Sequence, residues 1–522
     1  MITGKNYIGN ELTASGTDTY STLNPKTNSE NEFQFHEATE QEVDQAVNLA
    51  VTAFENYRTH SDKERAGFLE AIASEIEALG QDLIQMYTKE SGLPEGRANG
   101  ELARTVGQLR AFSNMLKEGS WVEAIISRVP EKTDIRRMQI PLGPIAVFGA
   151  SNFPLAFSTA GGDTASALAA GCPVVVKSHP MHAGTGELVA TAVIRAAEAT
   201  GMPNGVFSNL NSKGIRVGQL LVQHLGIKAV GFTGSFQGGM ALSKIASERK
   251  IPIPVFAEMG SINPVVVLPS ALHQKKKFWA EQIASSVSLG AGQFCTNPGL
   301  IMGLEGEELD EFISLLGELL EKVEPACMLH SKIRQQYEKM KDQVLSGGKF
   351  SEVGQVQNHG EGNLVSPHVV AVDGADFKAN LNFHKEVFGP FSVVVKCKSK
   401  KELEEIIQGM EGQLTATILS EDLKEMSSYS RVIDDLRESV GRLIYNNVPT
   451  GVEVCAAMTH GGPFPATLDS KYTSVGLSAV KRWVRPISYQ DWPDSQLPKA
   501  LQNSNPLDIL RTVNGDVSKS FI

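Results

Sequence analysis

Four short apolar runs, separated by stretches with helical spacing, constrain the fold of this chain more than any other feature. The runs are PIAVFGA, CPVVVKS, IKAVGFTG and PVFAEMG, which begin at residues 144, 172, 227 and 254. Helices are expected between them, at about residues 157–170, 184–199 and 236–249. Strand, loop, helix and strand in this order are typical of a parallel sheet with crossover helices. The alternation resumes after residue 295 with GLIMGL, FSVVVKC and TATILS, so the sequence predicts two α/β domains.

The residues before the first run are predicted to be mainly helical. Thr39 with Glu42, and Ser61 with Glu64, form capping-box patterns, and each pair precedes apolar residues at helical spacing. A further helix is expected in GELARTVGQLRAFSNML, and the alternating stretch ISRVPEKTDIRRMQIPLG indicates a pair of strands. A chain of 522 residues suits about two or three domains.

The charge and the cysteines exclude several classes of protein. The formal net charge is −11, so a basic surface for nucleic acid is not expected. The start, MITGKNYIGN, lacks the basic and apolar regions of a secretory signal, and no apolar run is long enough to cross a membrane. The five cysteines are scattered and form no CxxC pair, which argues against a disulfide framework and favours a reducing, cytoplasmic setting. No spacing of histidines or cysteines supports a metal site, so no metal is expected.

One of these cysteines, Cys295, lies in the stretch LGAGQFCTNPG. A cysteine kept for packing usually has apolar neighbours, whereas small and polar residues surround this one. Such residues let the backbone approach a ligand closely and can direct N–H groups at a negative charge. From these residues alone, Cys295 could be a nucleophile, a metal ligand, half of a disulfide or a small core residue.

Small and charged residues follow the predicted strands, and an open parallel sheet binds ligands at that edge. In FTGSFQGG, Gly234, Ser235, Gly238 and Gly239 lie between a strand and a helix, where a phosphate can reach the helix N-terminus. The stretch is not a GxGxxG motif, and a tight turn between strand and helix would explain it equally well. Lys177 follows another strand and could reach a ribose hydroxyl or a phosphate, or could simply be a solvated lysine.

The residues around Lys177 favour NADP over NAD. Sites for NAD often hold the ribose 2′-hydroxyl with a carboxylate, which would repel the 2′-phosphate of NADP. The stretch KSHPMHAG has no acidic residue, and Ser178 and His179 could donate hydrogen bonds to that phosphate. Arg216 in SKGIRVG could add positive charge or stack on the adenine. His179 and His182 are expected at the surface or beside the cofactor rather than on a metal.

Three more motifs complete a pattern that resembles a known family. ASNFPLAF contains Asn152 and FAEMGSINP contains Glu258, each directly after a predicted strand. KEVFGPF contains Glu386 and Phe388. With GFTGS and GQFCTNPG, these motifs occur in the order and spacing of the aldehyde dehydrogenase superfamily, over about 240 residues. The stretches KSHPMHAGT, EMGSINPV, GQFCTNPGL and GGPFPATLDSKYTSVG are similar to its NADP-preferring branch, which includes α-ketoglutaric semialdehyde (2,5-dioxovalerate) dehydrogenases and a bacterial long-chain aldehyde dehydrogenase.

The resemblance implies a role for each matching residue. Cys295 matches the nucleophile and Glu258 the general base. Asn152 matches the side-chain half of an oxyanion hole that the N–H of Cys295 completes. Lys177 matches the lysine at the adenosine ribose, and Glu386 the carboxylate at the nicotinamide ribose. Gly234 and Ser235 match the pyrophosphate turn, and Phe388 matches the residue against the nicotinamide.

The sequence also departs from the family near the expected substrate site. Ser261 stands where most members have a second glycine after the base, and Ser151 replaces the usual aromatic residue before Asn152. The C-terminal catalytic loop is THGGPFPAT instead of the common glycine-tyrosine-lysine form. These changes leave the residues of the core chemistry in place. The substrates of other family members, however, cannot be assigned to this chain on the resemblance alone.

The resemblance implies an NADP-dependent aldehyde dehydrogenase that could also use NAD. Cys295 would form a thiohemiacetal, hydride would pass to the nicotinamide, and Glu258 would activate water to hydrolyse the thioester. The favoured substrate is 2,5-dioxopentanoate, which would give 2-oxoglutarate. Alternatives are a broad aliphatic or fatty aldehyde dehydrogenase, an acylating dehydrogenase that uses coenzyme A, and a catalytically silent binding protein on the same scaffold. A carboxylate substrate needs a cationic anchor, for which Arg104 and Lys471 are candidates, although both could be surface charges.

The resemblance also implies a Rossmann-type cofactor domain, an α/β catalytic domain and a small β element for oligomerisation. The cofactor domain is expected at residues 1–122 and 142–259, and the catalytic domain at 260–478. The oligomerisation strands are expected at 123–141 and 479–498, with a C-terminal tail at 499–522. We expect a homodimer or a dimer-based tetramer, because exposed sheet edges of this kind tend to be covered by a partner subunit.

Overall fold

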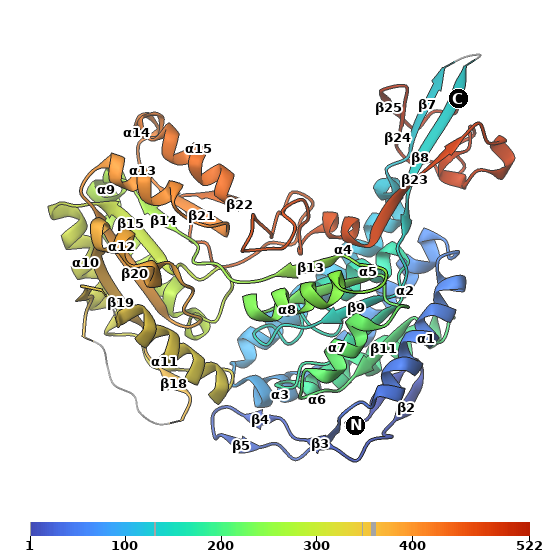
Figure 1. Ribbon diagram of the computed structural model, residues 1–522, viewed down its shortest axis with the longest axis horizontal. Helices are drawn as coiled ribbons and strands as arrows, with labels where there is room; N and C mark the ends of the chain where they lie inside the picture. Colours follow the sequence, from blue (N-terminus) through green and yellow to red (C-terminus); the bar gives the residue numbers. More distant parts are fainter. Residues whose placement is uncertain (1, 130–131, 347, 356–361) are drawn as a thin grey trace.

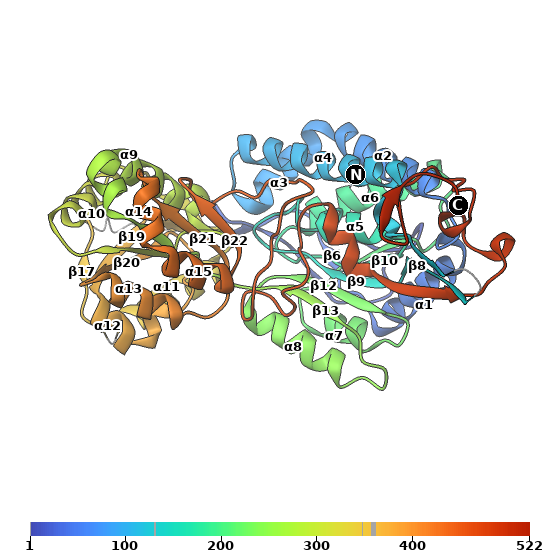
Figure 2. The same cartoon turned by 90° about the horizontal axis from the view of Figure 1, so that it is seen from above.

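The computed structural model describes residues 2–129, 132–346, 348–355 and 362–522. The chain forms two lobes, and a small sheet projects from one of them (Figure 1). Seen from above, the lobes lie side by side, and the segment after β22 (Val440–Tyr445) returns from the second lobe to the first (Figure 2). Within the described residues, no helix is both long and apolar enough to span a membrane.

The first lobe is built on a sheet of seven strands in the order β13-β12-β9-β10-β11-β1-β2. Neighbouring strands from β13 to β11 run parallel, and β1 and β2 join antiparallel at one edge. The bounds are β1 (Asn6–Ile8), β2 (Glu11–Thr13), β9 (Ile145–Phe148), β10 (Val174–Lys177), β11 (Phe207–Leu210), β12 (Ala229–Thr233) and β13 (Val255–Glu258). The four apolar runs therefore form β9, β10, β12 and β13, as predicted.

Helices cover both faces of this sheet, and each face has its own apolar core. The predicted capping boxes are both present, since Thr39 with Glu42 and Ser61 with Glu64 exchange the expected hydrogen bonds. The helices are α1 (Glu40–Tyr57), α2 (Asp62–Ala78), α3 (Gly80–Ser91), α4 (Glu95–Glu118), α5 (Gly162–Ala170), α6 (Ala183–Ala199), α7 (Arg216–Gln223) and α8 (Phe236–Ser247).

The start of α5 differs from the prediction of a helix from residue 157. The carboxylate of Glu101, which is buried on α4, accepts hydrogen bonds from the backbone N–H groups of Leu155 and Ala156 at 2.8 and 3.0 Å. These bonds hold residues 153–161 in turns, and the helix begins only at Gly162. The sequence pattern could not reveal this, because Glu101 is more than 50 residues away along the chain.

The second lobe has a sheet in the order β17-β19-β20-β15-β14-β21-β22, parallel except for β17. Its other strands are β14 (Val265–Val267), β15 (Leu300–Leu304), β17 (Ser351–Glu352), β19 (His368–Asp373), β20 (Phe391–Cys397) and β21 (Gln413–Leu419). The helices are α9 (Pro269–Ser288), α10 (Glu307–Leu320), α11 (Ser331–Leu345), α12 (Gly374–Ala379), α13 (Lys400–Gln408), α14 (Leu423–Ser428) and α15 (Ser430–Ser439). Short two-stranded ladders are formed by β3 (Thr19–Tyr20), β4 (Leu23–Asn24), β5 (Ser29–Glu30), β6 (Phe35–His36), β16 (Ala326–Cys327) and β18 (Leu364–Val365).

The projecting sheet has five strands in the order β23-β8-β7-β24-β25. The expected strand pair forms β7 and β8, which run antiparallel, and residues 484–490 pair with β8. The end of the chain also joins this sheet, because β24 pairs parallel with β7. The bounds are β7 (Ile125–Val129), β8 (Thr133–Pro141), β23 (Val484–Gln490), β24 (Arg511–Val513) and β25 (Asp516–Ser518).

Candidate active site

The candidate site lies between the two large sheets. In the first lobe, β9, β10, β12 and β13 are parallel and in register, so the residues that follow them share one edge. In the second lobe, Ser261, Cys295 and Glu386 precede β14, β15 and β20, which are also parallel. The carboxyl edge of the first sheet therefore faces the amino edge of the second. An open α/β sheet binds ligands at its carboxyl edge, so the junction is the expected position for a ligand.

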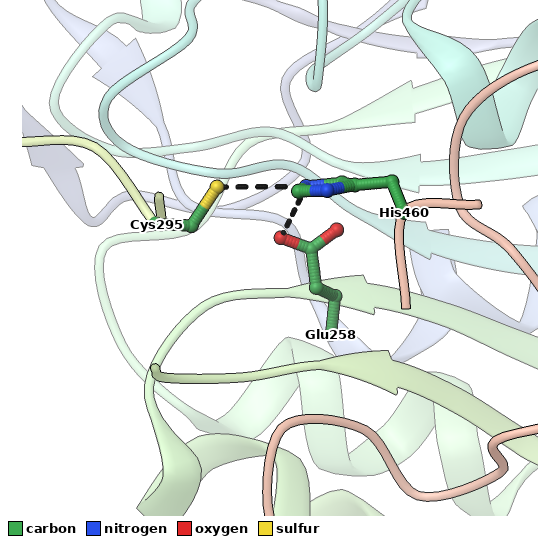
Figure 3. Close-up of side chains that lie close together, drawn as sticks. All are labelled: Glu258, Cys295 and His460. Carbon is green, nitrogen blue, oxygen red and sulfur yellow. Dashed lines mark hydrogen bonds and ion pairs between the residues drawn. The ribbon is translucent and has the colours of Figure 1, made fainter. Parts of the chain in front are cut away.

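Three titratable side chains converge at this junction (Figure 3). The Sγ atom of Cys295 lies 3.5 Å from Nε2 of His460, and the same nitrogen lies 3.0 Å from Oε1 of Glu258. Ser474 donates a hydrogen bond of 2.6 Å to the other carboxylate oxygen of Glu258. Glu258 and His460 are only 2 % and 1 % exposed, whereas Cys295 keeps partial access to solvent.

The surroundings shift the pKa values of the thiol and the carboxyl in opposite directions. Burial and the negative charge of Glu258 raise the pKa of Cys295 well above its ordinary value. Burial alone would also raise the pKa of Glu258, but His460 and Ser474 outweigh it, so the pKa of Glu258 falls below its ordinary value. At neutral pH the pair is therefore a thiol beside a carboxylate.

His460 is the main site residue that the sequence analysis missed. It lies 165 residues after Cys295, in the irregular segment between β22 and β23. Its backbone N–H bonds the hydroxyl of Thr473, and its carbonyl accepts from Ser474, so the histidine and the serine that flank Glu258 are tied together. The departure of THGGPFPAT from the family pattern was the one available signal, since this stretch contains the histidine.

The loop that carries Cys295 has an unusual backbone. Gly290, Ala291 and Gly292 all have positive φ angles, of 56°, 55° and 63°. A Cβ on Gly292 would lie 2.3 Å from the backbone of Gly389, so only glycine allows this close approach. The Nδ2 group of Asn263 bonds the carbonyl of Cys295 at 2.8 Å and thereby fixes the position of the loop.

Asn152 reaches the same loop from the first lobe. It follows β9, is 9 % exposed, and donates from Nδ2 to the carbonyl of Gln293 at 3.0 Å. This contact brings Asn152 to the loop that carries Cys295. Phe153 beside it packs against Phe157 and Phe294, with ring centroids 5.1 and 5.6 Å away.

Glu386 and Phe388 lie near the segment that follows the base. The carboxylate of Glu386 would be 2.3 Å from a Cβ on Gly260, and the backbone N–H of Ser261 points at it from 3.4 Å. Burial raises the pKa of Glu386 to about 7, and the charge of Glu258 adds to the rise. Both residues line one hollow together with Ser261 and Phe294.

Ser261, which replaces the second glycine of the family pattern, has a structural role. Its hydroxyl contacts the side-chain oxygen of Gln413 at 2.9 Å and accepts from the backbone N–H of Leu414 at 3.0 Å. The serine thus ties the segment after Glu258 to β21. A glycine could not make either contact.

Lys177 ends β10 and donates from Nζ to the carbonyl of Ser212 at 2.7 Å. Burial lowers its pKa to about 8, and the carboxylate of Glu37 opposes that change. Glu37 also accepts a hydrogen bond of 2.6 Å from the hydroxyl of Ser212. The stretch KSHPMHAG has no acidic residue, which favoured NADP. The carboxylate of Glu37, from another part of the chain, acts on Lys177 and weakens that argument.

The residues after Lys177 differ in accessibility. Ser178 is buried, and its hydroxyl has no hydrogen-bond partner among the described residues. His179 stacks on His182 with ring centroids 4.8 Å apart, and Nε2 of His182 lies 3.0 Å from the carbonyl of Ala150. Burial lowers the pKa of His179 well below its ordinary value and that of His182 to about 4, so both rings are neutral at pH 7.

The turn between β12 and α8 is open to solvent. Ser235 caps α8 by accepting from the N–H of Gly238 at 3.2 Å, and Gly234 donates from its N–H to the carbonyl of Glu258 at 3.0 Å. Gly239 is packed so closely that a Cβ would lie 2.6 Å from the sulfur of Met259. Small residues at an exposed helix N-terminus suit a phosphate group. Arg216, in contrast, is largely exposed and pairs with Glu40 at 3.2 Å.

The thiol, imidazole and carboxylate are also the donor types that bind Zn²⁺. One ligand atom from each of Cys295, His460 and Glu258 lies within 4.8 Å of the other two. The spacing of these residues along the chain gives no hint of this set.

The fold has two α/β lobes, and a cysteine, a glutamate and an asparagine lie at their junction. This combination is typical of aldehyde dehydrogenases. The family profile described as "Aldehyde dehydrogenase family" matches residues 12–466, and the chain belongs to that family of NAD(P)-dependent enzymes. Among curated proteins, the chain is 46 % identical to alpha-ketoglutaric semialdehyde dehydrogenase 2 of Azospirillum brasilense, over 99 % of both chains. It is 41 % identical to alpha-ketoglutaric semialdehyde dehydrogenase of Acinetobacter baylyi, again over 99 % of both.

Solved structures confirm the predicted fold. The betaine aldehyde dehydrogenase of Staphylococcus aureus, solved in complex with NAD+, matches with a TM-score of 0.81 and 20 % identity. The match covers 94 % of this chain and 95 % of that one. At this identity the comparison bears on the fold alone.

Proposed function

We propose that this enzyme oxidises 2,5-dioxopentanoate (α-ketoglutaric semialdehyde) to 2-oxoglutarate, with NADP as the hydride acceptor. The observation that carries the substrate is the pair of relatives with this name, which are 46 % and 41 % identical over 99 % of their lengths. The alternative is a broad aliphatic or fatty aldehyde dehydrogenase, which would oxidise hexanal as well as it oxidises 2,5-dioxopentanoate.

The first step uses Cys295 and Glu258. The carboxylate of Glu258 accepts the thiol proton, and the resulting thiolate attacks the aldehyde carbon, so that an S–C bond forms and the carbonyl oxygen becomes an oxyanion. The amide of Asn152 and the N–H of Cys295 donate to that oxyanion. Loss of one such donor typically costs about 3–4 kcal/mol of transition-state stabilisation.

A nicotinamide cofactor held by Lys177, Ser235 and Glu386 would supply the hydride acceptor, so that the carbon bound to Cys295 would become a thioester. Glu258 then releases the thiol proton to solvent and removes a proton from water, the hydroxide attacks the thioester carbon, and the S–C bond breaks to give a thiolate. The acid leaves, and the thiolate of Cys295 takes the proton that Glu258 holds. His460 and Ser474 hold both oxygens of Glu258 in place for these proton transfers.

The residues along the edge of the first sheet fit a dinucleotide. The open turn at Gly234 and Ser235 suits the pyrophosphate, with Gly239 allowing the helix to pack closely, and Lys177 suits the adenosine ribose. Glu386 would accept from the nicotinamide ribose, and Phe388 would lie against the nicotinamide. We assign the 2′-phosphate of NADP to the neighbourhood of four residues: Lys177, Ser178, His179 and Arg216. Glu37 is the residue that would favour NAD instead, so both cofactors must be compared.

The same proposal covers the domains and the assembly. The cofactor domain is residues 1–122 and 142–259, and the catalytic domain is residues 260–478. The oligomerisation strands at residues 123–141 and 479–498, which belong to the projecting sheet, would join two copies into a homodimer or a dimer-based tetramer. Five free cysteines suit a reducing setting such as the cytoplasm.

The test is a comparison of kcat/KM for 2,5-dioxopentanoate and hexanal, with NADP and with NAD. We expect 2,5-dioxopentanoate to exceed hexanal by at least about tenfold, because a site built for a polar group rejects an analogue that lacks it. Equal or faster turnover of hexanal would overturn the substrate. Equal kcat/KM values for the two cofactors would overturn the preference for NADP.

A further inference from the structure

Arg104 on α4 has two hydrogen-bond donors that no protein group uses. Its Nη1 donates to the backbone carbonyl of Val452, while Nε and Nη2 are buried and have no partner among the described residues. Nε and one Nη form the edge of a guanidinium that binds a carboxylate with two parallel hydrogen bonds. A buried donor without a partner is costly, so a ligand that supplies two acceptors would be well matched.

The other arginines nearby are satisfied in different ways. On the same helix, Arg97 lies between the rings of Phe153 and Phe294, and Arg110 pairs with Glu70 and Glu77. Within the described residues, no carboxylate lies within 4.0 Å of the nitrogens of Arg104. The carboxylates of Glu101 and Glu453 act on Arg104 only from a longer distance, so its open edge points to an anion from outside.

Arg442 is the closest comparison. It donates from both Nη atoms to the carbonyls of Gly451 and Pro449, at 3.0 and 2.9 Å. Arg104 and Arg442 therefore hold the same loop, but among the described residues Arg442 lacks a partner at Nε alone. Support of the loop requires only Nη1 of Arg104, so it does not explain why Nε and Nη2 are buried without partners in the part of the chain that the structure describes.

The position of Arg104 relates it to the reacting thiol. Its guanidinium lies 5.3 Å from the centroid of Phe157, whose ring is 6.2 Å from that of His460. His460 in turn contacts Cys295. Burial lowers the pKa of Arg104, and Cys295 and Glu101 are among the groups that oppose this change; Cys295 opposes the same change at Arg442.

We propose that Arg104 binds the carboxylate of the substrate and selects aldehydes that carry an acid group at the other end. This inference rests on the proposed function, in which Cys295 attacks the aldehyde. In 2,5-dioxopentanoate, four carbon–carbon bonds of about 1.5 Å separate the two ends, so an extended substrate spans about 5 Å. The ring of Phe157, which lies near both the guanidinium and the ring of His460, would pack against the methylene groups.

The test compares an acid substrate with a neutral one of equal length. The ratio of kcat/KM for 2,5-dioxopentanoate to that for pentanal is measured in the wild type, Arg104→Gln and Arg104→Lys. We expect the ratio to fall about 100-fold in Arg104→Gln, through a higher KM for the acid, because a buried charge pair is lost. Arg104→Lys keeps the charge but loses the fork and should recover part of the ratio.

Two controls separate binding from support of the loop. Arg442→Gln removes a charge and a brace of the same loop, and we expect it to leave the ratio within about threefold of the wild type. Lys471 is exposed, and Lys471→Gln should also leave the ratio unchanged. If Arg104→Gln lowers both substrates equally, or if Lys471→Gln lowers the ratio instead, the proposal is overturned.

A second measurement keeps this proposal distinct from the choice of substrate. 2-Oxoglutarate is used as an inhibitor of pentanal oxidation, and its inhibition constant should rise about 100-fold in Arg104→Gln. If that rise occurs but the wild type turns over another ω-oxo acid faster than 2,5-dioxopentanoate, the anchor stands and the substrate is wrong. An unchanged inhibition constant would overturn the anchor whichever aldehyde is oxidised.

Discussion

Nε2 of His460 lies 3.0 Å from Oε1 of Glu258, and both side chains are almost completely buried. Because Cys295 approaches the same nitrogen, this cluster differs from a cysteine–histidine pair in which the second ring nitrogen is oriented by a third group. The Nδ1 atom of His460 has no partner in the described part of the chain. The imidazole is therefore placed to orient the carboxylate of Glu258 through Nε2.

Replacement of His460 should impair the step in which Glu258 activates water. We expect His460→Ala to lower kcat by about 100-fold, since general base catalysis contributes at least that much. A first burst of reduced cofactor should remain if only hydrolysis is slowed. His460→Gln, whose amide can still donate to Glu258, should be less affected. Rapid-mixing absorbance measures the burst, and a fully active His460→Ala would refute this role.

Removal of the thiol should abolish turnover. We expect Cys295→Ala to lower kcat by at least about 10⁴-fold, because loss of a nucleophile removes the covalent pathway. Cys455 is exposed and lies in the loop braced by Arg442, so Cys455→Ala is the matched control and should stay active. Activity is followed as reduced cofactor formed; a Cys295→Ala enzyme that keeps its rate would contradict the assignment.

The raised pKa of Cys295 makes its alkylation depend on pH. Only the thiolate reacts, so below this pKa the rate with iodoacetamide should rise about tenfold per pH unit, up to at least pH 9. Glu258→Gln removes the neighbouring negative charge, which should lower the pKa and speed the reaction at pH 8. Mass spectrometry of the peptide with Cys295 gives the rate. A plateau below pH 8 in the wild type would show that the thiol is already ionised.

Cofactor affinity should depend on pH through Glu386. Its pKa of about 7 means that the free enzyme holds this carboxyl protonated below pH 7, and the proton must leave before the ribose hydroxyls can donate to it. The Kd for NADP should therefore rise about tenfold per unit below pH 7 and be constant above it. Glu386→Gln should abolish this dependence. Quenching of tryptophan fluorescence at pH 6, 7 and 8 would show a flat Kd if the prediction is wrong.

Zinc should inhibit the enzyme by binding the thiol, imidazole and carboxylate together. We expect loss of activity at micromolar Zn²⁺ and full recovery with a chelator, because each of these groups is a good zinc ligand. The inhibition should strengthen as pH rises, since Zn²⁺ displaces the thiol proton. His460→Gln removes one ligand and should raise the inhibitory concentration. The residual activities of the wild type and His460→Gln are compared over a range of Zn²⁺ concentrations. Equal inhibition of the two would show that these three side chains do not bind zinc together.

Local patterns allowed much of the fold to be predicted. The strands β9, β10, β12 and β13 and both capping boxes depend on neighbouring residues, and all were found where expected. The start of α5 was wrong because the carboxylate of Glu101 captures two amides of the preceding turn. The strands at the end of the chain were missed for a similar reason, since β24 is held by pairing with β7, far away in the sequence.

The site shows the same division. Cys295, Glu258 and Asn152 lie in motifs whose order indicated the family, and the structure brings them to one junction. His460, Glu37 and the open edge of Arg104 depend on contacts between distant segments, so no local pattern could reveal them. The surroundings of Lys177 illustrate the limit best, because the acidic residue that its own segment lacks is supplied by Glu37.

The pairing of a buried thiol with a carboxylate has a consequence for how this enzyme endures oxidative stress. Peroxides oxidise a thiolate to sulfenic acid and beyond, whereas a neutral thiol reacts slowly. Because Glu258 keeps Cys295 protonated at neutral pH, the resting enzyme should survive peroxide that would inactivate a protein with an ionised cysteine. The same arrangement that delays attack on the aldehyde until Glu258 takes the proton thus protects the sulfur between turnovers.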